Sequence, residues 1–189
     1  MHDLSPLGYH LVNVLLHSLV CLIFYKICQK LTSNQISQNA SLLFALHPIH
    51  TEAVTGIVGR AELLSSLFFL LSIWIHLSQK LVKNELVKLF LSMFFACCAM
   101  FCKEQGITVL GILAIYEIFV KKQTNLTLLA VKILAFVLTG VALLASRFLV
   151  MGQTLPVFTN FDNPASYADF PTKQLTWAYL LPGKLIFFF

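Results

Sequence analysis

Seven ionisable side chains lie at the edges of long apolar runs of this chain. They are His47, His50, Glu52, Arg60, Glu62, Lys103 and Glu104. Arginine keeps its charge and offers a planar fork that matches phosphate oxygens, and lysine adds a compact positive charge. Ionisable groups at membrane depth are costly, commonly around 3 kcal/mol each, so they tend to line polar cavities. The set predicts a binding site for the phosphorylated headgroup of a lipid.

The segment HPIHTE, residues 47–52, also contains the ligand types of a metal site. His47, His50 and Glu52 supply two imidazoles and a carboxylate, as several catalytic zinc and iron sites do. Their HxxHxE spacing crosses Pro48, however, and is not the i, i+4 spacing that aligns two ligands on one helix. We therefore expect no metal and keep a metal site as the alternative.

Helix ends explain part of the set without any ligand. Glu62 stands in the first turn of an expected helix, where the macrodipole favours an anion. Lys103 and Glu104 form a second pair of opposite charges, and an exposed ion pair is worth little. Ligand binding and helix capping both stay open for these residues.

The composition places these residues in a membrane protein. Hydrophobic residues make up 58% of the 189 residues and charged residues only 11%, and the mean hydropathy is +0.83. A soluble domain of this composition would expose large apolar patches. The net charge of +5 is scattered between apolar runs and forms no basic stripe, so we expect no nucleic-acid partner.

About 20 residues of helix cross the hydrocarbon of a bilayer, and this rule predicts an all-α polytopic membrane protein. A membrane region over residues 1–151 is expected to cross about six times. The expected spans are residues 9–28, 36–49, 63–77, 86–102, 106–120 and 126–151. The second span is short and is stopped by Pro48, so a full crossing and a broken one are equally compatible with it.

The lysines and arginines predict the orientation, because they collect in cytosolic loops. If residues 36–49 cross, one side of the membrane receives Lys26, Lys30, Lys80, Lys83, Lys88, Lys121 and Lys122, and the other side receives Arg60, Lys103, Arg147 and Lys173. The lysine-rich side is then cytosolic. All seven candidate site residues face the lumenal or external side, together with the loop after residue 151.

Other signals are weaker. The sequons at Asn39 and Asn125 fall at the cytosolic side or within membrane depth, so neither is expected to carry a glycan. His17 and His76 lie within spans and are expected to be buried with satisfied hydrogen bonds. The five cysteines form no CxxC and no zinc spacing. No GxGxxG, Walker, HExxH or GxSxG motif occurs, so nucleotide hydrolysis and zinc-protease chemistry have no support.

Four blocks carry a resemblance to a known family. The blocks YHLVNVLLH, FALHPIHTEAVTGIVGRAELLS, CKEQGITVLGILAIYEIF and NPASYADFPTKQLTWAYLLP closely resemble, in the same order, the membrane region of the transmembrane O-mannosyltransferases that carry tetratricopeptide repeats and act on cadherins. The resemblance covers about residues 4–182. It implies a C-type glycosyltransferase membrane core in the endoplasmic reticulum membrane, dolichyl phosphate mannose as the lipid-linked donor, and Ser or Thr of lumenal cadherin domains as acceptors.

The chain also departs from that family. The family begins with an earlier helix and a lumenal loop that carries the expected catalytic acids, and this chain starts after them. Residues 152–182 resemble a lumenal loop and the start of the family's uncharacterised domain, residues 183–189 diverge, and the tetratricopeptide repeats are absent. We therefore expect a truncated form whose activity as an enzyme stays open, with Glu52 and Glu62 as alternative acids. A non-catalytic membrane or partner-binding module and a transporter are the competing hypotheses.

Overall fold

The structure of the chain is a computed structural model that describes residues 7–56, 59–78, 83–121, 125–151, 168–176 and 178. The described residues form helices and turns and contain no strand. This confirms the all-α prediction. The chain divides into one compact unit over residues 1–147 and a second over residues 148–189, and the candidate site lies in the first.

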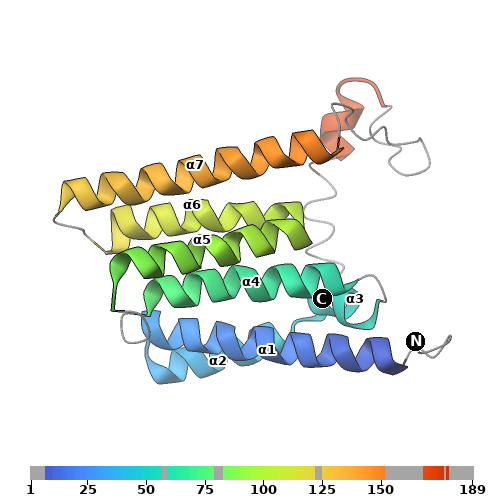
Figure 1. The fold of residues 1–189 in the computed structure, drawn as a ribbon. Helices are drawn as coiled ribbons and strands as arrows, with labels where there is room; N and C mark the ends of the chain where they lie inside the picture. Colours follow the sequence, from blue (N-terminus) through green and yellow to red (C-terminus); the bar gives the residue numbers. More distant parts are fainter. Residues whose placement is uncertain are drawn as a thin grey trace. The chain divides into compact units, whose positions relative to one another are not determined.

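Four described helices are long and apolar enough to cross a membrane, which confirms the expectation of a polytopic membrane protein. These are α1 (Leu7–Leu31), α4 (Arg60–Leu77), α5 (Glu85–Cys102) and α7 (Leu126–Met151). An 18-residue helix is about 27 Å long and matches a hydrocarbon layer of about 30 Å. In the first unit α1, α4 and α5 run side by side (Figure 1).

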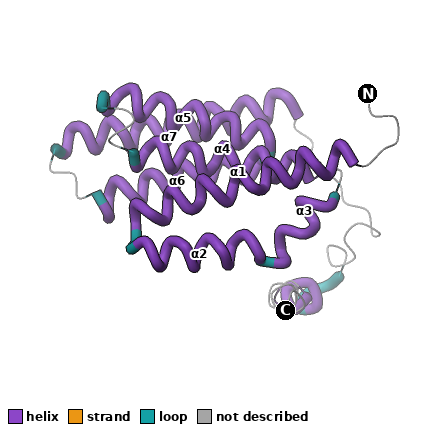
Figure 2. Tube along the Cα trace, turned by 90° about the horizontal axis from the view of Figure 1, so that it is seen from below, coloured by secondary structure: helices purple, strands orange, loops and turns teal. Residues whose placement is uncertain are grey.

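The span expected over residues 36–49 is a shorter helix, α2 (Asn34–Leu46). It ends where it does because Pro48 disfavours helical backbone at the preceding residue. His47 accordingly is extended, with φ −66° and ψ 126°. The chain continues through a 3-10 turn, η1 (Pro48–His50), and a one-turn helix, α3 (Thr51–Thr55). Helix α2 packs against α1 (Figure 2).

The span expected over residues 106–120 is divided into three helical pieces. A 3-10 turn, η3 (Glu104–Ile107), leads into α6 (Thr108–Ile115), and a wide π turn, η4 (Tyr116–Val120), follows. In the π turn the Lys121 amide donates to the Tyr116 carbonyl over 3.0 Å. Because α2 and α6 are shorter than a bilayer, the six crossings remain a prediction.

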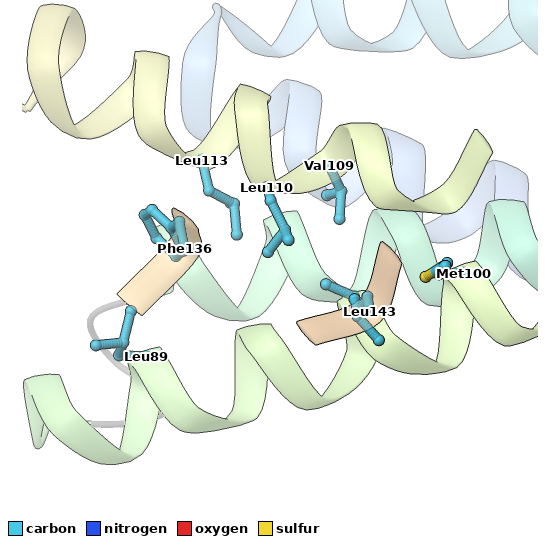
Figure 3. Close-up of a cluster of buried hydrophobic side chains, with 8 residues drawn as sticks. Leu89, Met100, Val109, Leu110, Leu113, Phe136 and Leu143 are labelled. Atoms are coloured by element: carbon cyan, nitrogen blue, oxygen red, sulfur yellow. The ribbon is translucent and has the colours of Figure 1, made fainter. Parts of the chain in front are cut away.

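The core of the first unit lies between α5, α6 and α7 (Figure 3). Its buried members are Leu89, Ala96, Met100, Val109, Leu110, Leu113, Phe136 and Leu143. Large apolar side chains also cover the outer surface, as at Leu138 on α7, which is 59% exposed. Apolar residues on both faces of a helix suit a bundle that is surrounded by lipid.

Small polar side chains join neighbouring helices. The hydroxyl of Ser65 on α4 donates to the Ala99 carbonyl of α5 over 2.9 Å, and Ser72 donates to the Ser92 carbonyl over 2.7 Å. Asn13 is fully buried in α1, and its amide donates to the Gly56 carbonyl at the end of α3 over 2.9 Å. Such bonds are common between membrane helices, where lipid offers no competing partner.

The two histidines expected within spans differ. His76 is buried, and its Nε2 lies 2.8 Å from Glu117 Oε1, so that prediction is confirmed. His17 is half-buried, and its Nε2 lies 3.4 Å from the Ala45 carbonyl oxygen.

Helix α7 ends at Met151, where the predicted membrane region also ends. Of the segment predicted as a lumenal loop and the start of another domain, residues 152–182, the structure describes residues 168–176 and 178, with helix over 172–176. Residues 152–167, and the predicted divergent tail at 183–189, lie outside the described residues.

Candidate functional site

The candidate residues gather where α1, α4 and α6 begin and α5 ends. Two ion pairs tie these helix ends together. Lys103, the residue that caps α5, pairs with Glu62 in the first turn of α4. Arg147, near the end of α7, pairs with Glu104. The structure therefore brings Glu62, Lys103 and Glu104 to one end of the bundle.

A cavity of about 330 Å³ opens beside the Glu62–Lys103 pair. Its walls come from α2, α4, η3 and the start of α6, and its lining includes Phe44, Glu62, Ser65, Ser66, Phe69, Leu70, Lys103, Gln105, Gly106 and Thr108. Apolar aromatic walls with three hydroxyls and one ion pair suit a ligand that is partly apolar and partly charged. The two ionic side chains remain open to solvent, Lys103 at 36% and Glu62 at 52% exposure.

Lys103 owes its position to the way α5 ends. The residue is extended, with φ −155° and ψ 136°, so the chain leaves the helix axis and turns at once into η3. Gly106 makes this tight return possible. A Cβ atom at Gly106 would lie 2.5 Å from the carbonyl oxygen of Ala99 on α5, so only glycine lets the two backbones approach this closely.

A second cavity of about 350 Å³ lies beside the same turn. It is lined by Met100, Phe101, Cys102, Lys103, Glu104, Gln105 and Arg147. Lys103 and Gln105 line both cavities, so the two spaces adjoin at this turn. The site therefore offers two cations, Lys103 and Arg147, around one wall.

Arg147 was not among the residues selected from the sequence. The orientation analysis did place it on the same side as Lys103, as the one arginine near the end of the last long apolar run. That position is the signal that could have found it, because an arginine at a membrane boundary is a natural partner for a phosphate.

The histidines form a separate aromatic cluster with Phe44. His50 packs on Phe44 with ring centroids 4.5 Å apart and on His17 at 5.0 Å, while His47 lies 6.3 Å from His50. Burial lowers the pKa of His50, and the nearby His17 and His47 lower it further. A neutral imidazole at this place donates or accepts a hydrogen bond and carries no charge into the apolar surroundings.

His47 has a structural role at the end of α2. Its Nδ1 accepts a hydrogen bond of 3.2 Å from the Ile49 amide and so caps the first turn of η1. Among the described residues no group of three or more His, Cys, Asp or Glu side chains is arranged to hold a metal ion.

Arg60 and Glu52 line neither of these two cavities. The guanidinium of Arg60 lies over the Tyr9 ring, 4.4 Å from its centroid, and its buried Nε has no hydrogen-bond partner. Glu52 is exposed in α3. Phe44 separates the groups, since it lines the first cavity and also packs on His50. The structure thus joins three of the seven candidates at the cavities and leaves four beside them.

Comparison with known proteins gives a consistent set of relatives. The chain is 42% identical over 205 residues to Protein O-mannosyl-transferase TMTC3 of Homo sapiens, which covers 96% of this chain and 22% of the relative. It is 39% identical over 242 residues to Protein O-mannosyl-transferase Tmtc3 of Drosophila melanogaster, with 96% and 26% coverage. It is 43% identical over 195 residues to Protein O-mannosyl-transferase tmtc2 of Xenopus laevis, with 94% and 23% coverage.

These alignments cover almost all of this chain, which spans about a quarter of the length of the curated relatives it matches. They are also longer than its 189 residues, so the relatives contain residues in this region that the chain lacks. No family model and no solved structure matches the chain.

Proposed function

We propose, on the premise that this chain belongs to the family of the transmembrane protein O-mannosyl-transferases, that it forms part of the membrane core of an enzyme that transfers mannose from a lipid phosphate to a protein. The homology over nearly the whole chain supports this proposal. Dolichyl phosphate mannose as the donor, cadherin-type lumenal domains as acceptors and the endoplasmic reticulum as the membrane follow from the family resemblance and belong to the same proposal.

The reaction defines what the site must do. The hydroxyl oxygen of an acceptor Ser or Thr forms a bond to C1 of mannose while the bond from C1 to the phosphate oxygen breaks. The hydroxyl proton goes to a base, and the lipid phosphate leaves with one more negative charge than it had as a diester. Fixed positive groups beside the departing oxygen stabilise this charge as it develops.

The observation that carries the proposal is the position of Lys103 in the wall between two adjoining cavities. A phosphate at this wall would meet Lys103 directly and Arg147 on its far side. Both cations now pair with exposed carboxylates, Glu62 and Glu104. Exposed ion pairs are worth about 0–1 kcal/mol, so a phosphate can replace either carboxylate at little cost.

The remaining candidates take more limited parts in this proposal. Glu62 lines the cavity in which we place the donor, and Glu52 does not, so Glu62 is the carboxylate to test as the base. His47 and His50 line neither cavity and lie beyond Phe44, so they would bond the headgroup only if it extends past that ring. Arg60 reaches the phosphate only if its guanidinium leaves the Tyr9 ring.

Removal of the cations tests the phosphate site. Lys103→Gln and Arg147→Gln should each weaken binding of a photoreactive dolichyl phosphate probe by roughly 10- to 150-fold, because a hydrogen bond to a charged group is worth about 1.5–3 kcal/mol. Lys30→Gln is the matched control, since Lys30 is an exposed lysine at the last turn of α1. Equal labelling of all three variants and the unchanged chain would exclude a phosphate site at Lys103.

The same preparations separate the three functional hypotheses. Transfer of mannose from dolichyl phosphate mannose to a cadherin-type domain identifies an active enzyme. Probe binding at Lys103 without transfer identifies a module that binds the lipid but needs other residues for catalysis. Solute flux across liposomes that contain the chain, without probe binding, identifies a transporter.

A further inference from the structure

A second charged cluster lies at the opposite end of the helices, and the proposed transfer reaction does not use it. This cluster, called here the lysine network, joins α4, α5, η4 and α7. Its members are His76, Glu85, Lys88, Glu117, Lys121 and Lys132. The π turn η4 contributes to it by keeping Glu117 and Lys121 on one face of the chain. Such turns are rare and occur often at functional sites.

The inner half of the network consists of His76, Glu117 and Lys132, and all three side chains are buried. Glu117 is fully buried, and its Oε1 lies 2.9 Å from Lys132 Nζ and 2.8 Å from His76 Nε2. Lys132 is 1% exposed. Charged groups this deep must be paired, because an unpaired buried charge is far more costly than a buried ion pair. The inner half therefore stabilises the packing of α7 and α4 against η4 through the two contacts of Glu117.

The outer half of the network consists of Glu85, Lys88 and Lys121, and it reaches the surface at the carboxylate of Glu85. Glu85, whose side chain is 34% exposed, is held by three lysines. Its Oε1 lies 2.5 Å from Lys88 Nζ, and its Oε2 lies 2.9 Å from Lys121 Nζ and 2.7 Å from Lys132 Nζ. Three ammonium groups that converge on one half-buried carboxylate form a site for an anion, with Glu85 as its present occupant.

The network has more positive than negative charge. Three lysines face two carboxylates, and His76 adds no negative charge. Lys88 is 2% exposed, yet its ammonium group, which can donate three hydrogen bonds, has Glu85 as its one acceptor among the described residues. Buried donors without acceptors are costly, so an added anion would be stabilised by the unused hydrogen bonds of Lys88. It would also balance the excess positive charge of the network.

The surroundings of the opening are apolar and face outward. Leu86 is 62% exposed, Phe119 is 70% exposed and Leu126 is 75% exposed. These residues neighbour Glu85, Lys121 and the start of α7 in the chain. An anion that carries hydrocarbon chains gains contact with this surface, whereas a soluble anion does not.

We propose that the outer half of the lysine network binds the headgroup of an anionic phospholipid, with its acyl chains on the apolar surface beside α5, η4 and α7. This end carries the lysine-rich loops and so faces the cytosolic leaflet, where anionic lipids are enriched. Basic pockets between membrane helices on this side of a bilayer are suited to such headgroups. The phosphate takes hydrogen bonds from Lys88 and Lys121 and displaces Glu85 from part of its contacts.

Native mass spectrometry of the full chain in micelles that contain phosphatidylserine and phosphatidylcholine tests this site. The chain should retain phosphatidylserine in preference to phosphatidylcholine, and Lys121→Gln should weaken that retention about fivefold, the usual effect of one lysine near an anionic surface. Lys121→Arg keeps the charge and should retain the lipid. Lys30→Gln, which removes an exposed lysine outside the network, should leave retention unchanged.

Glu85→Gln distinguishes a lipid site from a purely structural network. Without the resident carboxylate the three lysines lack their closest anion, so phosphatidylserine retention should rise about fivefold or more. A fall or no change after Glu85→Gln would overturn the proposal, as would equal losses from Lys121→Gln and Lys30→Gln. Inorganic phosphate should compete poorly, and full competition at equal concentration would identify a soluble anion as the ligand and overturn the lipid assignment.

Discussion

The two ends of the helix bundle carry similar charged residues in opposite environments. At the end that contains the candidate site, the paired side chains are exposed by 36–66%. At the lysine network the inner pair of Glu117 and Lys132 is exposed by at most 2%. Exposed pairs are weak and exchangeable, whereas a buried pair cannot lose one partner without a large penalty. The first end is therefore suited to exchanging a ligand, and the second to holding helices together.

The lysine distribution predicts that the two ends face opposite sides of the membrane, and labelling with a membrane-impermeant maleimide gives an all-or-none test of that prediction. Lys83→Cys and Glu52→Cys place thiols at exposed positions of the two ends. We expect Glu52→Cys to react from the lumenal side and Lys83→Cys from the cytosolic side of sealed vesicles. The unchanged chain, with its five half-buried cysteines, is the background control. Lumenal reaction of Lys83→Cys would reverse the orientation.

Glycosylation gives an independent test of the predicted orientation of the helices in the membrane. Asn125 lies directly before α7 at the lysine-rich end, and Asn39 lies within α2. Glycans are attached on the lumenal side, so neither sequon should be modified, and an endoglycosidase should leave the gel mobility unchanged. A mobility shift that Asn125→Gln abolishes would mean that the number of crossings is wrong by one.

The largest expected difference in stability is between the variants Glu117→Gln and Glu62→Gln. Glu117→Gln takes from the buried Lys132 one of its two carboxylate partners and should lower the free energy of unfolding by up to about 3–5 kcal/mol, the range for breaking a buried ion pair. Glu62→Gln removes an exposed pair and should cost about 0–1 kcal/mol. Thermal unfolding in detergent compares the two variants directly. The double variant Glu117→Leu with Lys132→Leu should recover much of the loss, because it removes both charges together.

Equal effects of Glu117→Gln and Glu62→Gln would contradict the division between the two ends. A double variant no more stable than Glu117→Gln alone would show that the network contributes through its shape and hydrogen bonds instead of its charge balance.

Two glycines test how closely the site end is packed. Gly106→Ala places a methyl group against the backbone of Ala99 and Met100 and should cost about 1–3 kcal/mol. It should also weaken probe binding, since Lys103 and η3 move with it. Gly111→Ala, in α6, meets no atom within 4 Å and should be neutral or stabilise by up to about 1 kcal/mol. A neutral Gly106→Ala would mean that η3 adjusts without loss.

The long helices were predictable because bilayer thickness sets their length. The apolar run at residues 126–151 became α7 with the same limits, and the run at 86–102 became α5 within one residue. The break after α2 followed from Pro48. The pieces of the span at 106–120 were not predictable, because hydropathy does not distinguish a π turn from an α turn.

The charged contacts were harder to predict, for a physical reason. Glu117 and Lys132 each lay inside an expected span, and that position was a signal of function or pairing. Glu85, the second partner of Lys132, is 47 residues away from it, however, and only the packing of α5 against α7 joins them. At the site end the pairing of Arg147 with Glu104, 43 residues apart, depends on packing in the same way. Local sequence shows which residues need partners and does not show which partner each receives.

The smallest expected effect separates two roles for Arg60. Over the Tyr9 ring its half-buried guanidinium forms a cation–π contact, worth on the order of 1 kcal/mol. Arg60→Ala and Tyr9→Leu should then each lower the free energy of unfolding by about that amount, and the double variant should lose less than the sum. Arg60→Lys should keep part of the contact, because it keeps the charge and loses the planar fork. Probe binding in all of these variants should stay within about twofold of the unchanged chain. If Arg60→Ala weakens probe binding tenfold or more, with Tyr9→Leu having no such effect, the guanidinium leaves the ring for the phosphate and the donor site extends from Lys103 to the start of α4.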